Sequence, residues 1–225
     1  ISLLPWLLLA ALAAALACAM AVPEVAAARE RPAPAAVGPV LRRPEVMAFF
    51  LACLFMAVAH GPLYAFYSIH LTDHAYAKTL VGAMWSLGVI AEIAVFLAMP
   101  QLTRRFAVRR LLAFSFACGV VRFLLIGWAV DSLALTLFAQ VLHAATYGLY
   151  HATAVSYINR WFAGALRARG QALYMSLTFG AGGMLGMFGS GLAWEAWGAG
   201  ITYSAASLCC LIGLVLVVLA VRERS

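Results

Sequence analysis

Residues 80–99 read LVGAMWSLGVIAEIAVFLAM, a run in which only Glu92 carries a charge. A helix of about 20 mostly apolar residues crosses the hydrocarbon core of a bilayer, because it rises about 1.5 Å per residue. Such runs are too long, and too rich in Leu, Ala and Gly, for barrel strands of about 10 alternating residues. The sequence therefore predicts an all-α, polytopic helical membrane protein with about seven transmembrane helices. The predicted helices cover residues 3–22, 46–71, 80–99, 111–130, 133–158, 172–194 and 201–221.

Composition and charge placement agree with this class. Of the 225 residues, 66% are hydrophobic and only 10% are charged, which is far from the balance of a soluble domain. The formal net charge of +7 comes from arginines in alternate connections between the predicted helices. These are Arg29, Arg31, Arg42, Arg43, Arg104, Arg105, Arg109, Arg110, Arg160, Arg167, Arg169, Arg222 and Arg224. Because basic residues favour cytoplasmic loops, this charge orients the protein, and no nucleic-acid partner is expected.

The sequence indicates no metal or cofactor. All five cysteines lie within apolar runs and without a CxxC pair, which is typical of buried structural residues. His70 and His74 flank Asp73 at the predicted outer surface, where we expect them to be solvated. An intramembrane metalloenzyme needs a tight ligand cluster, whereas His143 and His151 are eight residues apart. A GxSxG elbow is also absent from the sequence, so the chain is not predicted to be an enzyme.

One connection differs from the others in length and composition. Residues 23–44, PEVAAARERPAPAAVGPVLRRP, are polar and rich in Pro and Ala, which predicts an extended cytoplasmic linker. We expect residues 1–22 to be the last helix of an N-terminal bundle and residues 45–225 to be a C-terminal six-helix bundle. This layout is what remains of a twelve-helix protein without its first five helices. The N-terminal half of the same protein is therefore an expected partner, beside the lipid bilayer.

Two charged residues lie deep in predicted helices. Glu92 and Arg122 are each surrounded by apolar neighbours for more than a turn. A charge near the bilayer midplane costs at least about 2.5–3.5 kcal/mol, so each should face a partner or a watery cavity. The depth of both, and of His151, is roughly 10–17 Å from the cytoplasmic ends. An ion pair between Glu92 and Arg122 is the simplest arrangement, and it could couple protons or only lock two helices together.

Uncharged polar side chains are predicted to form stripes on three helices. On 133–158, polar residues recur at i, i+3, i+7 and i+11 and so share one face, which points to a lined cavity. Aromatic hydroxyls and amides suit a ring-shaped solute with a polar edge. The predicted substrate-binding residues are His60, Tyr64, Tyr67, Gln140, Tyr147, Gln171, Tyr174 and Thr178. The predicted proton-coupling residues are Glu92, Arg122, His143 and His151, because histidine changes charge near neutral pH.

Four segments resemble the C-terminal half of major facilitator superfamily proteins of the 3-phenylpropionate permease type, which are related to oligosaccharide and nucleoside proton symporters. These segments are HGPLYAFYSIHLTD (60–73), SLGVIAEIAVF (86–96), HAATYGLYHATAVSYINRWF (143–162) and GQALYMSLTFGAGGMLG (170–186). The resemblance implies a twelve-helix, proton-coupled symporter of the bacterial inner membrane, with this chain matching helices 6 to 12.

The resemblance also implies roles for particular residues. Related lactose permease couples protons through an acid on helix 8, an arginine on helix 9 and a histidine on helix 10. Glu92, Arg122 and either His143 or His151 fall on the matching helices. The glutamate that follows the lactose permease histidine by one turn is replaced here by Thr146 or Ala154, which shifts the expected proton carrier toward Glu92.

The sequence thus favours secondary active transport, with proton-coupled uptake of a small aromatic acid such as 3-phenylpropionate. Two alternatives remain within transport: efflux of amphipathic compounds, and proton symport of a sugar or nucleoside.

Overall fold

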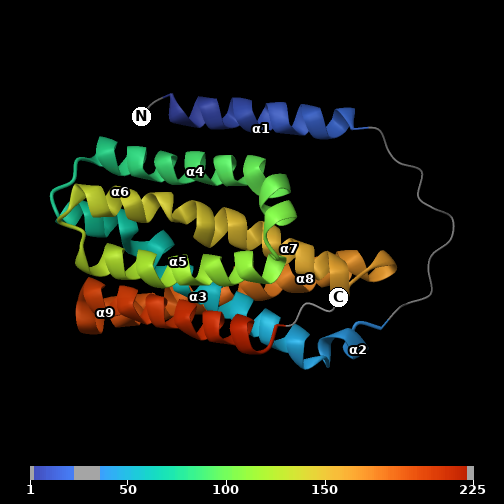
Figure 1. Ribbon diagram of the computed structural model, residues 1–225. Coiled ribbons are helices and arrows are strands. Elements are labelled where there is room, and N and C mark those ends of the chain that lie inside the picture. The colour runs from blue at the N-terminus through green and yellow to red at the C-terminus, as the bar shows by residue number, and fades with distance from the viewer. Residues whose placement is uncertain (1–2, 23–35, 222–225) are drawn as a thin grey trace. The chain divides into compact units, whose positions relative to one another are not determined.

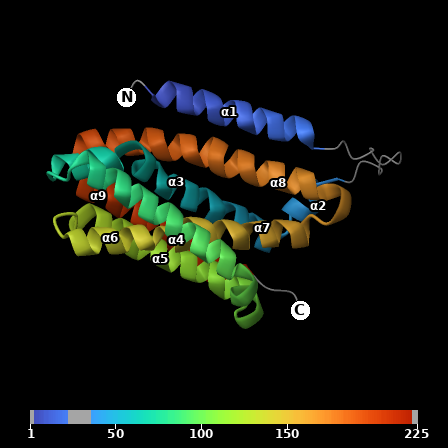
Figure 2. The same ribbon diagram turned by 90° about the horizontal axis from the view of Figure 1, so that it is seen from above.

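The computed structural model describes residues 3–22 and 36–221, and every regular element within these ranges is a helix (Figures 1 and 2). The chain divides into two compact units, Ile1–Pro34 and Ala35–Ser225. The first unit contains α1 (Leu4–Ala21). Residues 23–35 of the predicted linker, with Arg29 and Arg31, lie outside the described residues, as do Arg222 and Arg224.

The second unit is a bundle of long helices joined by short connections. Two of its helices contain π-helical segments, η1 and η3, in which each backbone carbonyl accepts a hydrogen bond from the N–H five residues later. In chain order the elements are α2 (Gly38–Leu41), α3 (Pro44–Asp73), α4 (Lys78–Arg105), α5 (Val108–Trp128), α6 (Leu133–Val141), η1 (Ala144–Leu149), α7 (Tyr150–Trp161), η2 (Gly164–Leu166), α8 (Arg167–Met175), η3 (Ser176–Gly182) and α9 (Gly183–Leu219).

Five helical runs among the described residues are long and apolar enough to cross a membrane, and Pro5–Ala21 is a shorter apolar helix. The five runs are Pro44–Asp73, Lys78–Arg105, Val108–Trp128, Leu133–Trp161 and Gly164–Leu219. The last run contains Gly198, whose φ of 75° and ψ of −176° are not helical. The chain turns back there, so this run supplies two helical segments. The prediction of an all-α, polytopic membrane protein is confirmed.

The core forms where α3 packs against both segments of α9. At the crossing with the first segment, a Cβ on Gly61 would come within 2.1 Å of the backbone carbon of Gly186. From the second segment, the Tyr203 hydroxyl donates a hydrogen bond of 3.3 Å to the carbonyl of Pro62. Glycine thus allows the backbones to approach closely, as is common between helices in membranes.

The helix formed by α6, η1 and α7 lies between α4 and α5 (Figure 1). Small residues let α4 come close to it. A Cβ on Gly88 would lie 3.2 Å from Cδ2 of His143, and a Cβ on Gly148 would lie 2.9 Å from Cγ of Glu92. Because Gly88 and Gly148 have no side chains, α4 can pack closely enough to place Glu92 directly beside η1.

Arginines gather at one end of the bundle. Arg42 and Arg43 precede α3, and the following arginines lie at the end of α4, the start of α5, the end of α7 and the start of α8. We call this the arginine end. At the opposite end, Asp73 is the last residue of α3, Lys78 is the first residue of α4, and Asp131 lies in the connection between α5 and α6. Apart from Arg122 within α5, the described arginines thus have the one-sided distribution expected of a multi-pass membrane protein.

The prediction that His70 is solvated is wrong. Its side chain is buried, and its Nε2 lies 2.9 Å from the carbonyl oxygen of Ile126 at the end of α5. The rings of Trp194 and Tyr203 pack against it at 5.7 Å and 5.6 Å. Three helices converge there, so a histidine near the end of a helix becomes part of the core. His74 is partly exposed and lies 3.8 Å from Asp131.

Candidate functional site

Arg122 lies at the centre of the bundle and has no acidic partner among the described residues. Its side chain is 0% exposed. Nε donates to the carbonyl of Ala139 at 3.0 Å, and the two terminal nitrogens donate to Thr146 Oγ1 at 3.0 Å and Gln140 Oε1 at 3.3 Å. All three acceptors are neutral. The expected ion pair with Glu92 is therefore not formed, because the guanidinium turns toward α6 and η1 instead.

Glu92 is paired with His143. Its Oε2 lies 3.8 Å from His143 Nε2, and the two side chains are 16% and 8% exposed. Gln140 and Thr146, which accept hydrogen bonds from Arg122, stand three residues before and three residues after His143. His143 therefore connects the acid of α4 with the part of the helix that holds Arg122.

Several buried polar atoms near Arg122 have no hydrogen-bond partner within the described part of the chain. They are Nε2 of His60, Nε2 of Gln140 and Nδ1 of His143. The Nδ1 of His60 donates to the Met56 carbonyl at 2.8 Å, which leaves its Nε2 as an acceptor. Buried polar atoms are nearly always satisfied in native proteins. Their concentration here indicates a place built to receive polar groups.

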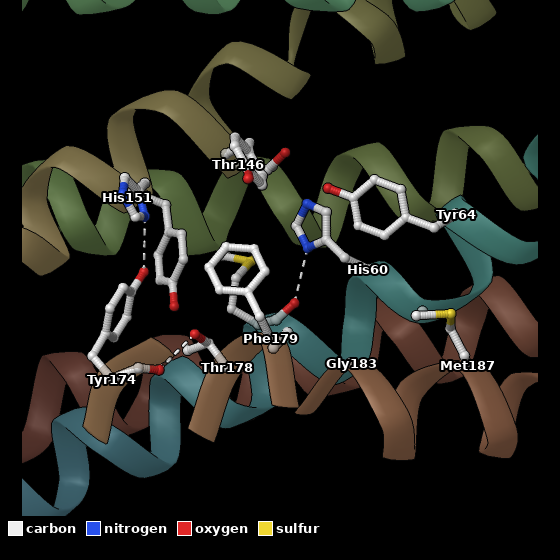
Figure 3. Close-up of a pocket in the computed structure, with 14 residues that line it drawn as sticks. His60, Tyr64, Thr146, His151, Tyr174, Thr178, Phe179, Gly183 and Met187 are labelled. Carbon is white, nitrogen blue, oxygen red and sulfur yellow. Dashed lines mark hydrogen bonds between the residues drawn. The ribbon is translucent and has the colours of Figure 1, made fainter. Parts of the chain in front are cut away.

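A pocket of about 120 Å³ opens beside this centre (Figure 3). Residues from α3, η1, α7, α8, η3 and α9 surround it, and most of its surface is aromatic or apolar. The lining residues are Met56, Ala57, His60, Gly61, Tyr64, Thr146, Tyr147, Tyr150, His151, Tyr174, Thr178, Phe179, Gly183 and Met187. Thr146 connects the pocket to the charged centre, because it lines the pocket and its hydroxyl accepts a hydrogen bond from Arg122.

A row of rings runs from the charged centre into the pocket. His143 stacks on Tyr147 at 5.5 Å between ring centroids, and Tyr147 stacks on His151 at 6.3 Å. At the far end, His151 Nδ1 shares a hydrogen bond of 3.2 Å with the Tyr174 hydroxyl (Figure 3). The rings are four residues apart, and the π-helical segment η1 brings such residues nearly into line. This row joins Glu92 and His143 to the pocket.

The structure brings together six of the twelve predicted site residues around the pocket: His60, Tyr64, Tyr147, His151, Tyr174 and Thr178. Glu92, Arg122, His143 and Gln140 form the adjacent charged centre. Two predicted binding residues do not line the pocket. Tyr67 is buried with its hydroxyl 3.8 Å from the sulfur of Met84, and it also interacts with Gln140 of the charged centre. Gln171 points elsewhere, because it donates to Asn159 Oδ1 at 3.2 Å.

Several lining residues were not predicted. Met56, Phe179 and Met187 are apolar, so nothing in the sequence distinguishes them from residues that face other helices or lipid. Tyr150 is different, since it was visible as a tyrosine in an apolar run, but it lies off the predicted stripe. The π-helical turn before it and its contact with the Cys53 carbonyl, at 3.5 Å, explain its place in the lining.

Comparison with known proteins gives the following relationships. The model of the MFS_1 like family matches residues 1–205. A protein of Escherichia coli strain K12, named a probable 3-phenylpropionic acid transporter, is 36% identical over 132 residues, which are 58% of this chain and 34% of that protein. YegT of the same strain, named as a candidate nucleoside transporter, is 28% identical over 151 residues, which are 65% of this chain and 35% of that protein. The chain thus spans about a third of the length of these relatives, and no solved structure matches it.

Proposed function

This chain belongs to the MFS_1 like family, and from that premise we propose that it is the C-terminal half of a secondary transporter that takes up a small aromatic acid together with protons. A substrate such as 3-phenylpropionate offers an apolar ring and one carboxylate. The aromatic pocket suits the ring, and the name of the 36% identical relative agrees with this class of solute.

The observation that carries the proposal is the buried guanidinium of Arg122, which has no acidic partner within residues 3–22 and 36–221. Arginine presents five N–H donors, and three of them are directed at neutral acceptors. A buried charge is costly unless it is paired. A carboxylate that enters from the pocket past Thr146 would supply the missing charge and could be bound by two N–H groups at once.

The same arrangement offers a way to couple the anion to a proton. We assign the proton to Glu92 and His143, which lie 3.8 Å apart. When Arg122 is unpaired, a proton on His143 places a second positive charge close to the guanidinium. A carboxylate held at Arg122 cancels that charge, so substrate and proton favour each other's binding. Such mutual stabilisation is the thermodynamic requirement for symport.

The second half of the transporter would complete the binding site. The pocket of about 120 Å³ is smaller than the roughly 300–1,000 Å³ of typical ligand pockets. In transporters built from two repeats, substrate binds between the halves near the midplane. We therefore propose that the N-terminal half of the same transporter supplies the remaining walls. With the arginine end facing the cytoplasm, the protein would lie in the bacterial inner membrane.

A second candidate function, nucleoside symport, is favoured by the relationship to YegT. A nucleobase is also flat and would suit the same rings. A nucleoside carries no charge, however, so it would leave Arg122 unpaired. Efflux of amphipathic compounds is separated from uptake by the direction of flux in an imposed pH gradient. The family relationship favours all of these over an intramembrane enzyme.

Proton movement on substrate addition tests the proposal. In de-energised cells that express the full-length transporter, we expect 3-phenylpropionate to make the external medium more alkaline, because each molecule enters with a proton. Nucleosides and disaccharides should give no change. Silence with all solutes, in cells where the protein is detected in the membrane, would contradict proton-coupled uptake.

Replacing Glu92 with Gln tests the assignment of the proton. In a pH gradient of one unit, a symporter with one proton accumulates its substrate about tenfold, since one pH unit is worth about 1.4 kcal/mol. We expect Glu92→Gln to abolish this accumulation, while exchange of labelled for unlabelled substrate continues. Glu195→Gln is the matched control, because Glu195 is exposed and lies far along α9 from the pocket residues. Normal accumulation by Glu92→Gln would show that another group carries the proton.

A further inference from the structure

A second cavity lies on the arginine side of the bundle, apart from the pocket and the charged centre. Its volume is about 610 Å³. The walls come from α4 and α5, and the floor comes from η1. The lining residues are Val95, Leu102, Phe106, Arg110, Leu111, Phe114, Ala145 and Leu149. We call this cavity the α4–α5 groove.

The α4–α5 groove has one charged residue, and that residue stands at its end. Seven of the eight lining residues are apolar, and only Arg110 carries a charge. Arg110 is exposed, and its side chain makes no hydrogen bond or ion pair with any described residue. Phe106 and Phe114 are 47% and 57% exposed, so the groove opens sideways rather than into the core. Its chemistry is that of an apolar channel with a cation at the mouth.

The length of the groove corresponds to one leaflet. From Arg105 at the end of α4 to Val95 there are ten residues, which make about 15 Å of helix. This is half of the roughly 30 Å hydrocarbon core. A groove that begins at the arginine end and reaches mid-bundle therefore matches the depth of a single acyl chain.

The positive charges around Arg110 favour a lipid with an anionic headgroup. Arg104 and Arg105 are exposed in the last turn of α4, within one connection of Arg110. Among the described acids, only Glu45 lies at the arginine end, in the first turn of α3. No described acid is present in the connection from α4 to α5. A phosphate would meet an uncompensated cluster of arginines there.

We propose that the α4–α5 groove binds an anionic phospholipid of the leaflet at the arginine end. One acyl chain lies along Leu102, Ala145 and Leu149, and the phosphate contacts Arg110. This inference does not depend on the transported solute, because neither Arg110 nor the groove takes part in the proposed substrate site.

Lipid retention tests the proposal directly. The full-length transporter would be purified in detergent, mixed with phosphatidylglycerol or phosphatidylcholine of identical acyl chains, and weighed with its bound lipid by native mass spectrometry. We expect phosphatidylglycerol to be retained in preference to phosphatidylcholine. Arg110→Ala should lower phosphatidylglycerol retention about fivefold and leave phosphatidylcholine unchanged, since one basic residue contributes about a fivefold attraction to an anionic surface.

Two further variants separate a site from general charge attraction. Arg167→Ala removes an exposed arginine from the same end of the bundle without touching the groove, and it should retain lipid as the unmodified protein does. Leu102→Trp fills the groove and should lower retention of both lipids. Equal losses for Arg110→Ala and Arg167→Ala would overturn the proposal, as would equal retention of the two lipids by the unmodified protein.

A measurement on the unmodified protein covers the case in which a variant does not fold. Phosphatidylglycerol that carries a photoreactive group midway along one acyl chain would be crosslinked to the transporter. We expect the label on peptides that contain residues 95–114 or 145–149. Label distributed over other helices, with none on these peptides, would exclude the groove as the binding place.

Discussion

Arg122→Met is expected to lower uptake of 3-phenylpropionate by about a hundredfold or more. Hydrogen bonds to charged groups contribute about 1.5–3 kcal/mol each, so loss of a two-pronged contact with a carboxylate corresponds to roughly that factor. Arg122→Lys should also fail, because an ammonium cannot reach Ala139, Gln140 and Thr146 and a substrate at the same time. Initial uptake rates of labelled acid in cells with equal amounts of membrane protein provide the measurement.

The control for this prediction is Arg160→Met, which removes an exposed arginine near the end of α7. It should transport within about twofold of the unmodified protein, since most surface substitutions have small effects. Size-exclusion profiles in detergent check that Arg122→Met folds. Uptake of the acid by a folded Arg122→Met protein at the normal rate would remove Arg122 from the binding site. Nucleoside uptake by the unmodified protein that persists in Arg122→Met would favour the second candidate function.

Gly61→Ala is expected to have the largest effect on stability. The added Cβ would lie 2.1 Å from the carbon and 2.4 Å from the oxygen of the Gly186 carbonyl, and neither can move without its helix. α3 and the first segment of α9 must therefore separate. Overpacking of this kind costs about 1–3 kcal/mol when side chains can adjust, and more when backbones collide. We expect a fall of several degrees or more in the melting temperature of the detergent-purified transporter.

Gly189→Ala is the matched control. It adds the same methyl group to α9, about one turn beyond Gly186, and the added Cβ meets nothing within 4 Å. It should leave the melting temperature unchanged or raise it slightly, since alanine favours the helix over glycine. Equal melting temperatures for Gly61→Ala and Gly189→Ala would contradict the close crossing. Because Gly61 also lines the pocket, Gly61→Ala should in addition weaken substrate binding in the protein that remains folded.

The fold could be predicted from two patterns that are easy to recognise in a sequence, long hydrophobic runs and the placement of arginines. Hydrophobic runs gave the position of each long helix, and the one-sided arginines gave their alternating directions. The structure extends most helices by a few residues beyond the apolar run. At its arginine end, for example, α4 continues to Arg105, where basic side chains stabilise the helix terminus. The turn at Gly198 was predicted as a gap between two runs, but its left-handed backbone could not be predicted.

The site was predictable only in part, for reasons of geometry. Polar residues in apolar runs identified the right helices, because such residues are costly in lipid and must face a partner or a cavity inside the bundle. Which residue meets which depends on helix rotation and close packing. Glu92 reaches His143 because Gly88 and Gly148 admit α4 closely, whereas Arg122 turns to a threonine, an amide and a carbonyl. Tyr67 shares a helix with His60 but is buried beside Met84 and Gln140 instead of lining the pocket.

The two π-helical segments have a consequence for how sequences of this kind are compared and redesigned. A π turn holds one residue more than an α turn, and η1 and η3 both border the pocket. Deleting one residue from either segment would replace the wide turn with an ordinary α turn and leave the helix beyond it facing almost the same way. An alignment with a relative that lacks the π turn therefore needs a single gap there, because without the gap every residue beyond the turn is paired with one about 100° around the helix. In a related protein of different specificity, an insertion or deletion at these two turns would change the residues that face the solute within the turn while the rest of the helix keeps its contacts.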